Sequence, residues 1–169
     1  YAEISSEVYD QLRDAPAVVA CPMSNGTTLA GVHRGFVSLY RRGKTSKVPR
    51  MVGGSAWRKN PIVHAFAAGL DRCEELKPEL IRETVVNEPL INWRSIDGDA
   101  ALAAIRGTHG HAGDATDRRM KQMARLLREQ QALHVLPAST AGLIALLDLH
   151  AADPLPPDRY VVVLTGRSS

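Results

Sequence analysis

The sequence predicts an α/β protein: a parallel sheet with helices on both faces. Short runs of apolar residues without polar alternation are separated by longer amphipathic stretches, and the connections between them are short. A strand that is buried on both faces is apolar throughout, whereas a helix that covers a sheet shows an apolar stripe with a period of 3.6 residues. Strands that alternate with helices form βαβ units, and these build a parallel sheet.

The expected strands follow from the apolar runs. Two of these runs, 17–21 and 160–164, are apolar from end to end, and they stop at Pro22 and at Thr165-Gly166. Both are therefore expected to be buried on both faces. Two further strands are expected at 49–54 and 133–136.

The expected helices follow from the apolar stripes and from capping residues. Pro61 suits the first position of the helix 60–69. Thr116 or Asp117 can cap the helix 117–131, and Ser139 or Thr140 can cap the helix 141–150. Residues 71–95 and 151–158 are expected to be irregular, and 109–116 to form a loop. The expected helices are 5–13, 28–42, 60–69, 97–105, 117–131 and 141–150.

Length and composition are those of one soluble domain. The chain has 169 residues, of which 44% are apolar and 23% charged, and no apolar run reaches the 18–20 residues that span a bilayer. Cys21 and Cys73 do not form a CxxC pair and have no histidine at zinc-finger spacing, so we expect no metal site and a reducing, cytoplasmic compartment. Because Tyr1 is followed directly by an amphipathic helix, we expect the chain to begin inside a longer protein.

The positive charge is unevenly distributed, although the net charge is only +3. The stretch between Asp14 and Asp71 contains no acidic residue. It can attract the phosphate of a small molecule, or it can be an ordinary solvated surface. Nucleic-acid binding is disfavoured because no basic-aromatic module accompanies the charge. The basic residues of this stretch are Arg34, Arg41, Arg42, Lys44, Lys47, Arg50, Arg58 and Lys59.

The segment Ser24-Asn25-Gly26-Thr27-Thr28 is the main candidate site. It follows a buried strand and opens a helix, and in open parallel sheets ligands bind at this edge. A helix N-terminus presents unpaired N–H groups and partial positive charge, while Gly26 lets backbone approach an anion closely. The hydroxyl groups of Ser24, Thr27 and Thr28 add donors. The segment is thus a candidate phosphate cradle, with an ordinary N-cap turn as the alternative.

Other candidate sites are less specific. Thr165 follows the last expected strand, so its hydroxyl is expected to face the same crevice, unless the residue is only a strand end. His109 and His111 alternate in a Gly-containing segment, which is compatible with a metal site or with a mobile loop. No GxSxG, P-loop or GxGxxG pattern is present.

Taken together, these segments resemble the threonine-synthase-like enzymes, a fold type II group that depends on pyridoxal phosphate (PLP). The resemblance rests on CysProMetSerAsnGlyThrThrLeuAlaGly (21–31), on ValProArgMetValGlyGlySerAla (48–56) and on AspGlyAspAlaAlaLeuAlaAlaIle (97–105). It continues with LeuProAlaSerThrAlaGlyLeu (136–143) and ValValValLeuThrGly (161–166). The order and spacing of the motifs make the match specific over nearly the whole chain.

The resemblance implies roles for individual residues. Ser24, Asn25, Gly26, Thr27 and Thr28 would hold the phosphate of PLP, and Thr165 would bond the pyridine nitrogen. A neutral hydroxyl stabilises a protonated ring less than a carboxylate does, which suits elimination and replacement at the β or γ carbon. Ser24 departs from the family pattern, which has glycine at this position.

The resemblance also implies an absence. In the family, the Schiff-base lysine lies upstream in a Ser-x-Lys-like segment, and none of Lys44, Lys47, Lys59, Lys77 and Lys121 has that context. We therefore expect residues 1–169 to be the C-terminal, cofactor-binding (large) domain portion of a longer enzyme, inactive alone and homodimeric at full length. The expected activity is a PLP-dependent lyase or synthase acting on a small amino acid, most like threonine synthase. A β-replacement enzyme (cysteate or cysteine synthase-like) and a non-catalytic binding or partner domain are the alternatives.

Overall fold

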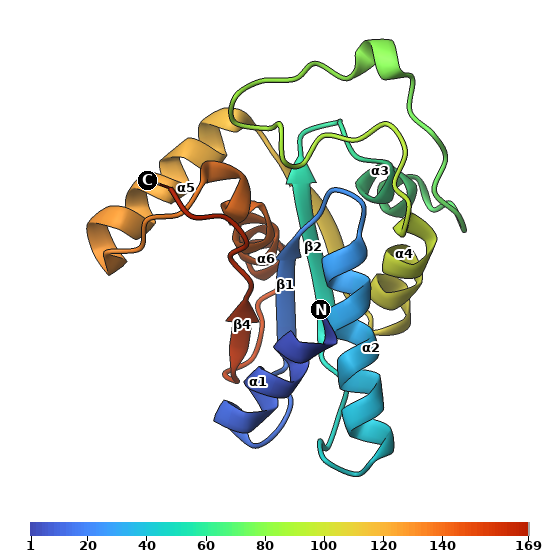
Figure 1. Ribbon diagram of the computed structural model, residues 1–169, viewed down its shortest axis with the longest axis vertical. Coiled ribbons are helices and arrows are strands. Elements are labelled where there is room, and N and C mark those ends of the chain that lie inside the picture. The colour runs from blue at the N-terminus through green and yellow to red at the C-terminus, as the bar shows by residue number, and fades with distance from the viewer. Residues whose placement is uncertain (169) are drawn as a thin grey trace.

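A four-stranded parallel sheet forms the centre of the molecule (Figure 1). The computed structural model describes residues 1–168, so Ser169, the last residue of the expected domain, lies outside the described residues. The strand order is β3-β2-β1-β4. The strands are β1 (Val18–Pro22), β2 (Arg50–Ala56), β3 (His111–Ala115) and β4 (Tyr160–Val162).

Helices cover both faces of this sheet, as the sequence predicts (Figure 1). One face carries α2, α3 and α4, and α1 packs on the outside of α2; the other face carries α6, with α5 beyond it. The helices are α1 (Ala2–Leu12), α2 (Thr27–Arg41), α3 (Pro61–Ala68), α4 (Gly98–Gly107), α5 (Asp117–Gln131) and α6 (Ala141–Ala152), and the 3₁₀ turns are η1 (Pro78–Leu80) and η2 (Pro137–Thr140).

The uniform burial of β1 explains its apolar sequence. All five residues of β1 are buried, and alternate side chains enter different cores. Val19 and Cys21 pack among the residues of α2, α3 and α4. Val18 and Ala20 pack with Ala145 and Leu146 of α6. A strand with core on both faces needs apolar residues at every position.

Two expectations about strands were wrong. Residues 109–116 are not a loop, because β3 pairs in parallel with β2 from Val52–His111 to Ala56–Ala115. Residues 133–136 do not join the sheet; they form only one antiparallel bridge, between Val135 and Arg167. Composition misled in both cases: HisAlaGlyAspAla has few strand formers, whereas LeuHisValLeu has several.

The last strand is shorter and less buried than expected. β4 spans Tyr160–Val162 instead of 160–164, and its three residues are half-buried. The only strand that pairs with β4 among residues 1–168 is β1, so β4 lies at an edge of the sheet. An edge strand does not need core on both sides. The apolar composition of this segment therefore led us to expect more burial than the structure shows.

Candidate functional site

A cavity of about 320 Å³ opens at the carboxyl ends of β1 and β4. This volume falls in the range of small-molecule sites, and this edge of a parallel sheet is where such sites occur. The cavity brings together all the residues that the sequence marks as candidates for phosphate and ring contacts, although Thr28 and Thr165 are far apart in the chain. The lining residues are Tyr1, Pro22, Ser24, Asn25, Gly26, Thr27, Thr28, Pro89, Leu90, Leu136, Ala138, Ser139, Thr165 and Gly166.

The N-terminus of α2 forms one wall of this cavity. Gly26 occupies the N-cap position, where no side-chain hydrogen bond caps the helix. The first-turn N–H groups therefore have no intrahelical acceptor and carry the positive end of the helix dipole. Ser24 and Thr28 line the cavity beside them with hydroxyl groups. This donor set fits a phosphate group.

Gly26 is required by its backbone and by its neighbours. Its φ is +84°, in the left-handed region that favours glycine. A Cβ at this position would lie 2.8 Å from Cβ of Ala101 and 2.9 Å from Cδ1 of Ile62. The loop before α2 is therefore pressed against α3 and α4, and glycine allows this close approach.

Asn60 attaches the cradle loop to the start of α3. Its side chain is buried, at 2% exposure, and both ends of the amide are used. Oδ1 accepts hydrogen bonds from the N–H of Ile62 (2.9 Å) and Val63 (3.3 Å), while Nδ2 donates to the carbonyl of Ser24 (3.0 Å). The same residue thus caps a helix and positions the loop.

A second attachment comes from the segment that precedes α4. Nδ2 of Asn92 donates to Oδ1 of Asn25 (2.5 Å), and Oγ of Ser95 donates to the carbonyl of Ser24 (3.0 Å). The N–H of Asp97 donates to the carbonyl of Asn25 (3.1 Å). We call Asn92, Ser95 and Asp97 the 92–97 tether.

The resemblance implies that the hydroxyl of Thr27 binds the phosphate, but in the structure this hydroxyl is bonded to Asp97. Oγ1 of Thr27 donates to Oδ2 of Asp97 over 2.6 Å. A hydroxyl has one proton to donate and an ionised carboxylate only accepts, so this proton is committed to Asp97. The backbone N–H of Thr27 lies in the first turn of α2, where N–H groups have no intrahelical acceptor.

The opposite wall of the cavity is held by Ser139. Oγ of this buried serine donates to the carbonyl of Gly166 (3.1 Å) and accepts from its N–H (2.6 Å). The N–H of Leu136 also donates to the carbonyl of Gly166, over 3.1 Å. Thr165, directly before Gly166, is exposed at the cavity. The segment before α6 thus fixes the position of Thr165.

Sequence reasoning missed these supporting residues. It predicted Ser139 or Thr140 as the cap of the last helix, and Thr140 does occupy the N-cap position of α6, but its hydroxyl makes no capping bond and donates to the carbonyl of Pro137 instead. Asn60 was the one recognisable signal, since Asn before Pro is a typical N-cap pair, and Thr116 does cap α5. No local pattern in 92–97 indicates a bond to residues about 70 positions earlier.

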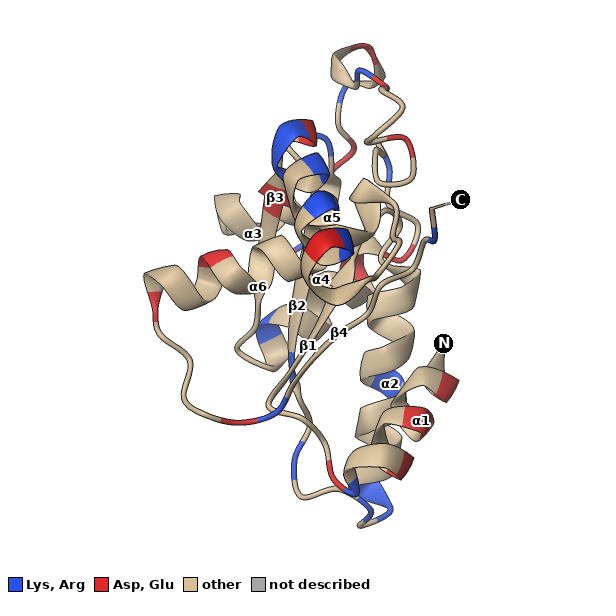
Figure 2. Ribbon diagram, turned by 90° about the vertical axis from the view of Figure 1, so that its left-hand side faces the viewer, with Lys and Arg blue, Asp and Glu red and all other residues tan. Residues whose placement is uncertain are grey.

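The eight basic residues between Asp14 and Asp71 do not line the cavity of the described chain, although the cradle loop lies in the same stretch of sequence. Figure 2 shows blue segments on α2 and in the turn beyond its C-terminal end, whereas Arg58 and Lys59 follow the carboxyl end of β2. Lys47 instead pairs with Asp158 (3.3 Å), and Arg58 lies over the ring of Trp57 (4.4 Å).

The five lysines are also absent from the cavity lining, as far as residues 1–168 are described. Lys59 is half-buried and the other four are exposed. Cys21 and His111 do not line the cavity either, and each packs against other residues of the fold. Burial raises the pKa of Cys21 to about 12, and burial lowers the pKa of His111, whose ring meets Phe66 edge-on.

No group of three or more His, Cys, Asp or Glu side chains within residues 1–168 is arranged to hold a metal ion. Over the same residues, every helix is too short or too polar to cross a bilayer.

The fold and the cavity define an open parallel α/β protein with a cavity at the carboxyl edge of its sheet, where small molecules bind in such folds. Residues 1–166 match the family model described as "Pyridoxal-phosphate dependent enzyme", and the chain belongs to this family. PLP is the cofactor of the family, and the donors at the start of α2 fit its phosphate group.

Relatives of known activity are similar along most of this chain. The threonine synthase of Methanocaldococcus jannaschii is 28% identical over 163 residues, which are 96% of this chain and 39% of the relative. The threonine synthase of Methanosarcina acetivorans is 29% identical over the same shares. The chain therefore spans about two fifths of the length of these curated relatives.

Solved structures share the fold. A fungal L-serine ammonia-lyase from Rhizomucor miehei superposes with a TM-score of 0.75 at 23% identity, over 99% of this chain and 50% of that one. Maize serine racemase superposes with a TM-score of 0.71 at 16% identity, over 99% and 48%. These similarities establish the fold type II architecture.

Proposed function

We propose that this chain is the C-terminal cofactor-binding (large) domain portion of a PLP-dependent lyase or synthase, most like threonine synthase. One observation carries the proposal: the candidate phosphate cradle and Thr165 line the same cavity, although about 140 residues separate them. The threonine synthases among its relatives support the choice of activity. The substrate is then a small amino acid with a leaving group at its β or γ carbon.

We assign the grip on the cofactor to two walls. The N–H groups of the first turn of α2, with the hydroxyls of Ser24 and Thr28, would hold the phosphate. Asn25, Gly26 and Thr27 would shape the loop and contribute backbone. Thr165 would bond the ring nitrogen. Bound PLP supplies an electron sink, and a neutral hydroxyl at the ring nitrogen makes that sink milder than a carboxylate would.

Affinity measurements test the two walls. In the full-length protein, Ser24→Ala combined with Thr28→Val should weaken PLP binding by about a hundredfold or more, because two hydrogen bonds to a charged group, each worth about 1.5 kcal/mol or more, are removed. Ser38→Ala, which changes an exposed serine further along α2, is the matched control and should leave the affinity unchanged. Equal affinities for both variants would contradict the assignment of the cradle.

We further propose that the lysine that bonds to the cofactor lies outside residues 1–169. The absence of all five lysines from the lining of the cavity supports this. Borohydride reduction of the full-length protein with PLP, followed by peptide mapping, should label a lysine that is not one of these five. Labelling of Lys59 or of any of the others would refute the proposal.

Product analysis distinguishes the possible reactions. The full-length protein should convert phosphohomoserine and water to threonine and phosphate. Formation of cysteate from an O-substituted serine and sulfite, or of cysteine from an O-substituted serine and sulfide, would favour the β-replacement enzyme instead. If PLP binds but no amino acid is converted, the chain is a non-catalytic PLP-fold binding domain.

The remaining assignments concern the whole protein. We propose that the full-length enzyme is a cytoplasmic homodimer. Light scattering of the purified full-length protein should give twice the mass of one chain, and a monomeric mass would exclude the dimer.

A further inference from the structure

The loop that forms the phosphate cradle is held by side chains from a distant part of the chain. Four hydrogen bonds join residues 24–27 to the 92–97 tether. In two of them a backbone carbonyl of the loop is the acceptor, and the other two join a side chain of the loop to a side chain of the tether. Their lengths are between 2.5 and 3.1 Å. Asn25 takes part with both its side chain and its backbone. The tether therefore bonds to Ser24, Asn25 and Thr27, three of the five residues of the cradle loop.

The tether comes from the end of a long irregular stretch. Residues 70–97 connect α3 to α4 and contain only the short turn η1, and in Figure 1 this stretch projects beyond the sheet. Asn92 is itself held at its backbone, because its N–H donates to the carbonyl of Lys59 (3.1 Å). The tether is thus a fixed point within a segment that has little regular structure.

Each bond of the tether acts on the direction of the helix N-terminus. Carbonyl groups of Ser24 and Asn25 accept from Ser95 and Asp97, so these carbonyls face the α4 side of the loop. A carbonyl that turned toward the cavity would repel a phosphate, since both carry negative charge. Holding the carbonyls away leaves the N–H groups facing the anion, which is the arrangement that anion sites need.

We propose that Asn92, Ser95 and Asp97 are positioning residues for the phosphate site: they act on affinity through the shape of the loop, without contact with the anion. Thr27 belongs to the same device, because its hydroxyl is committed to Asp97 and not to the phosphate. The inference rests on the proposed function, since it takes the cavity at α2 as the phosphate site. None of the three tether residues is among the residues that line that cavity.

The first test is the PLP affinity of the full-length protein. Asp97→Ala should weaken PLP binding about fivefold, because one hydrogen bond to a charged acceptor is lost from the loop. Asp97→Asn should restore most of the affinity, since an amide oxygen also accepts from the Thr27 hydroxyl. Asp99→Ala is the matched control: Asp99 lies in the first turn of the same helix and accepts from the N–H of Cys73, away from the loop. It should bind PLP normally.

The second test is a double-mutant cycle that separates positioning from direct contact. Thr27→Val should weaken binding about as much as Asp97→Ala, and the double variant should be no weaker than either, because both remove the same bond. If the hydroxyl of Thr27 contacted the phosphate, the two losses would multiply to about 25-fold and the proposal would be overturned.

A spectroscopic readout guards against a purely structural effect. The ³¹P signal of bound PLP should shift in Asp97→Ala and return in Asp97→Asn, whereas a general loss of stability would leave the signal of the bound fraction unchanged. If Asp97→Ala does not fold, Ser95→Ala removes a single bond from the tether and replaces it in the same measurements. An unchanged signal and affinity in the tether variant would refute the positioning role.

The outcomes also separate this inference from the assignment of the cradle. If Ser24→Ala with Thr28→Val weakens PLP binding but the tether variants do not, the cradle stands and the positioning role fails. If neither set changes the affinity, phosphate binds elsewhere and the cradle itself is wrong.

Discussion

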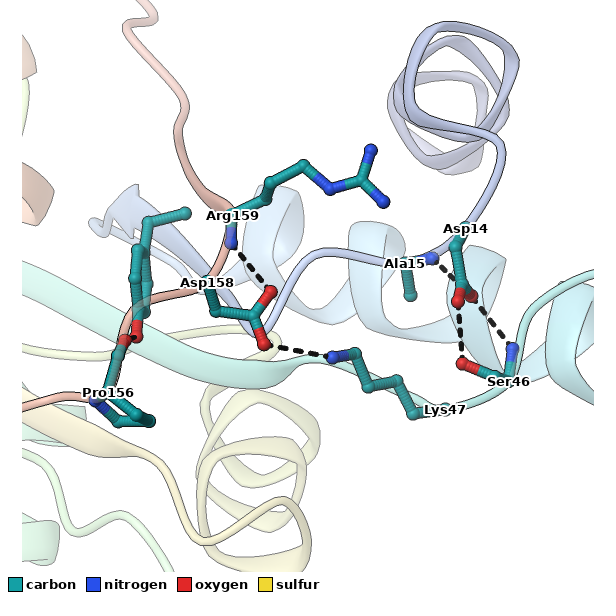
Figure 3. Close-up of polar contacts among 8 residues, drawn as sticks. Asp14, Ala15, Ser46, Lys47, Pro156, Asp158 and Arg159 are labelled. Atoms are coloured by element: carbon teal, nitrogen blue, oxygen red, sulfur yellow. Dashed lines mark hydrogen bonds and ion pairs between the residues drawn. The ribbon is translucent and has the colours of Figure 1, made fainter.

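Asp14 joins two segments that are distant in sequence. Its carboxylate accepts hydrogen bonds from the N–H and the hydroxyl of Ser46 (2.8 and 2.6 Å) and from the N–H of Ala15 (2.7 Å) (Figure 3). The bonds to Ser46 and Ala15 lower the pKa of Asp14 to about 2. The end of α1 is thereby attached to the chain that leads into β2, next to the ion pair of Lys47 with Asp158.

This attachment predicts a component of the acid sensitivity. Because the pKa of Asp14 is lower in the folded state, its stabilisation is complete above the unfolded pKa of 3.8 and is lost as the pH falls toward about 2. Asp14→Ala should lose up to about 1 kcal/mol of unfolding free energy at pH 6, since the group is largely solvated. The variant and the wild type should converge near pH 2, as measured by urea unfolding. Asp10→Ala, an exposed acidic residue on α1, should show no such difference.

Ser139 is a second residue whose loss should be costly. Ser139→Ala leaves the N–H and carbonyl of Gly166 without their hydroxyl partner in a half-buried place. We expect a loss of about 1–3 kcal/mol in the unfolding free energy, together with weaker PLP binding because Thr165 is no longer held. Chemical denaturation and PLP titration of the full-length protein measure both. A change in stability without any change in affinity would show that Thr165 does not contact the cofactor.

Strand prediction succeeded where the core dictates composition and failed at the margins of the sheet. The buried strand β1 is apolar because both of its faces meet core. β3 was missed because its residues are small and polar, and its place in the sheet depends on how closely it approaches β2. A Cβ at Gly110 would lie 1.8 Å from the carbonyl oxygen of Met51. Such a close approach is a tertiary property that strand propensity does not contain.

The contact of α6 with the sheet depends on two glycines. A Cβ at Gly54 would lie 1.9 Å from the carbonyl oxygen of Ala141, and one at Gly142 would lie 2.7 Å from the carbonyl carbon of Cys21. In both cases the obstacle is backbone, which cannot rotate away. The backbone of α6 therefore lies so close to the backbones of β1 and β2 that there is no room for a side chain at Gly54 or Gly142.

Gly54→Ala should consequently separate α6 from β2 and destabilise the protein by about 3 kcal/mol or more, since overpacking against backbone cannot be relieved by a rotamer change. Gly107→Ala is the matched control: nothing lies within 4 Å of its added Cβ, and it stands in the last turn of α4. That substitution should be neutral or stabilising by up to about 1 kcal/mol. Thermal unfolding of the two variants gives the comparison, and equal melting temperatures would contradict the packing argument.

At the scale of the whole molecule, the sequence indicated two of the segments that line the cavity, residues 24–28 and Thr165, but not the rest of its lining or what holds these segments. The loop 24–28 and Thr165 follow the ends of strands that pair in parallel, so their proximity follows from topology alone. The bonds of Asn92, Ser95 and Asp97 depend on how an irregular segment returns past α3 to the loop. Neither periodicity nor turn chemistry describes that path, and only the folded chain reveals it.

Cofactor binding should also stabilise the whole protein. A ligand that binds only the folded state adds about 2.7 kcal/mol of stability at a concentration 100 times its dissociation constant. The melting temperature of the full-length protein should therefore rise with PLP concentration, and Ser24→Ala with Thr28→Val should need more PLP for the same rise. A melting temperature that is insensitive to PLP would contradict binding to the folded state.

Asn60 couples two parts of the molecule in their dynamics. Its one buried amide closes the first turn of α3 and also holds the carbonyl of Ser24, so rotation of this side chain breaks both attachments together. Slow exchange of the Ile62 and Val63 amides should then follow the state of the cradle loop. A helix whose residues do not line the cavity would thus report whether the phosphate site is filled, through the lifetime of its amide protons.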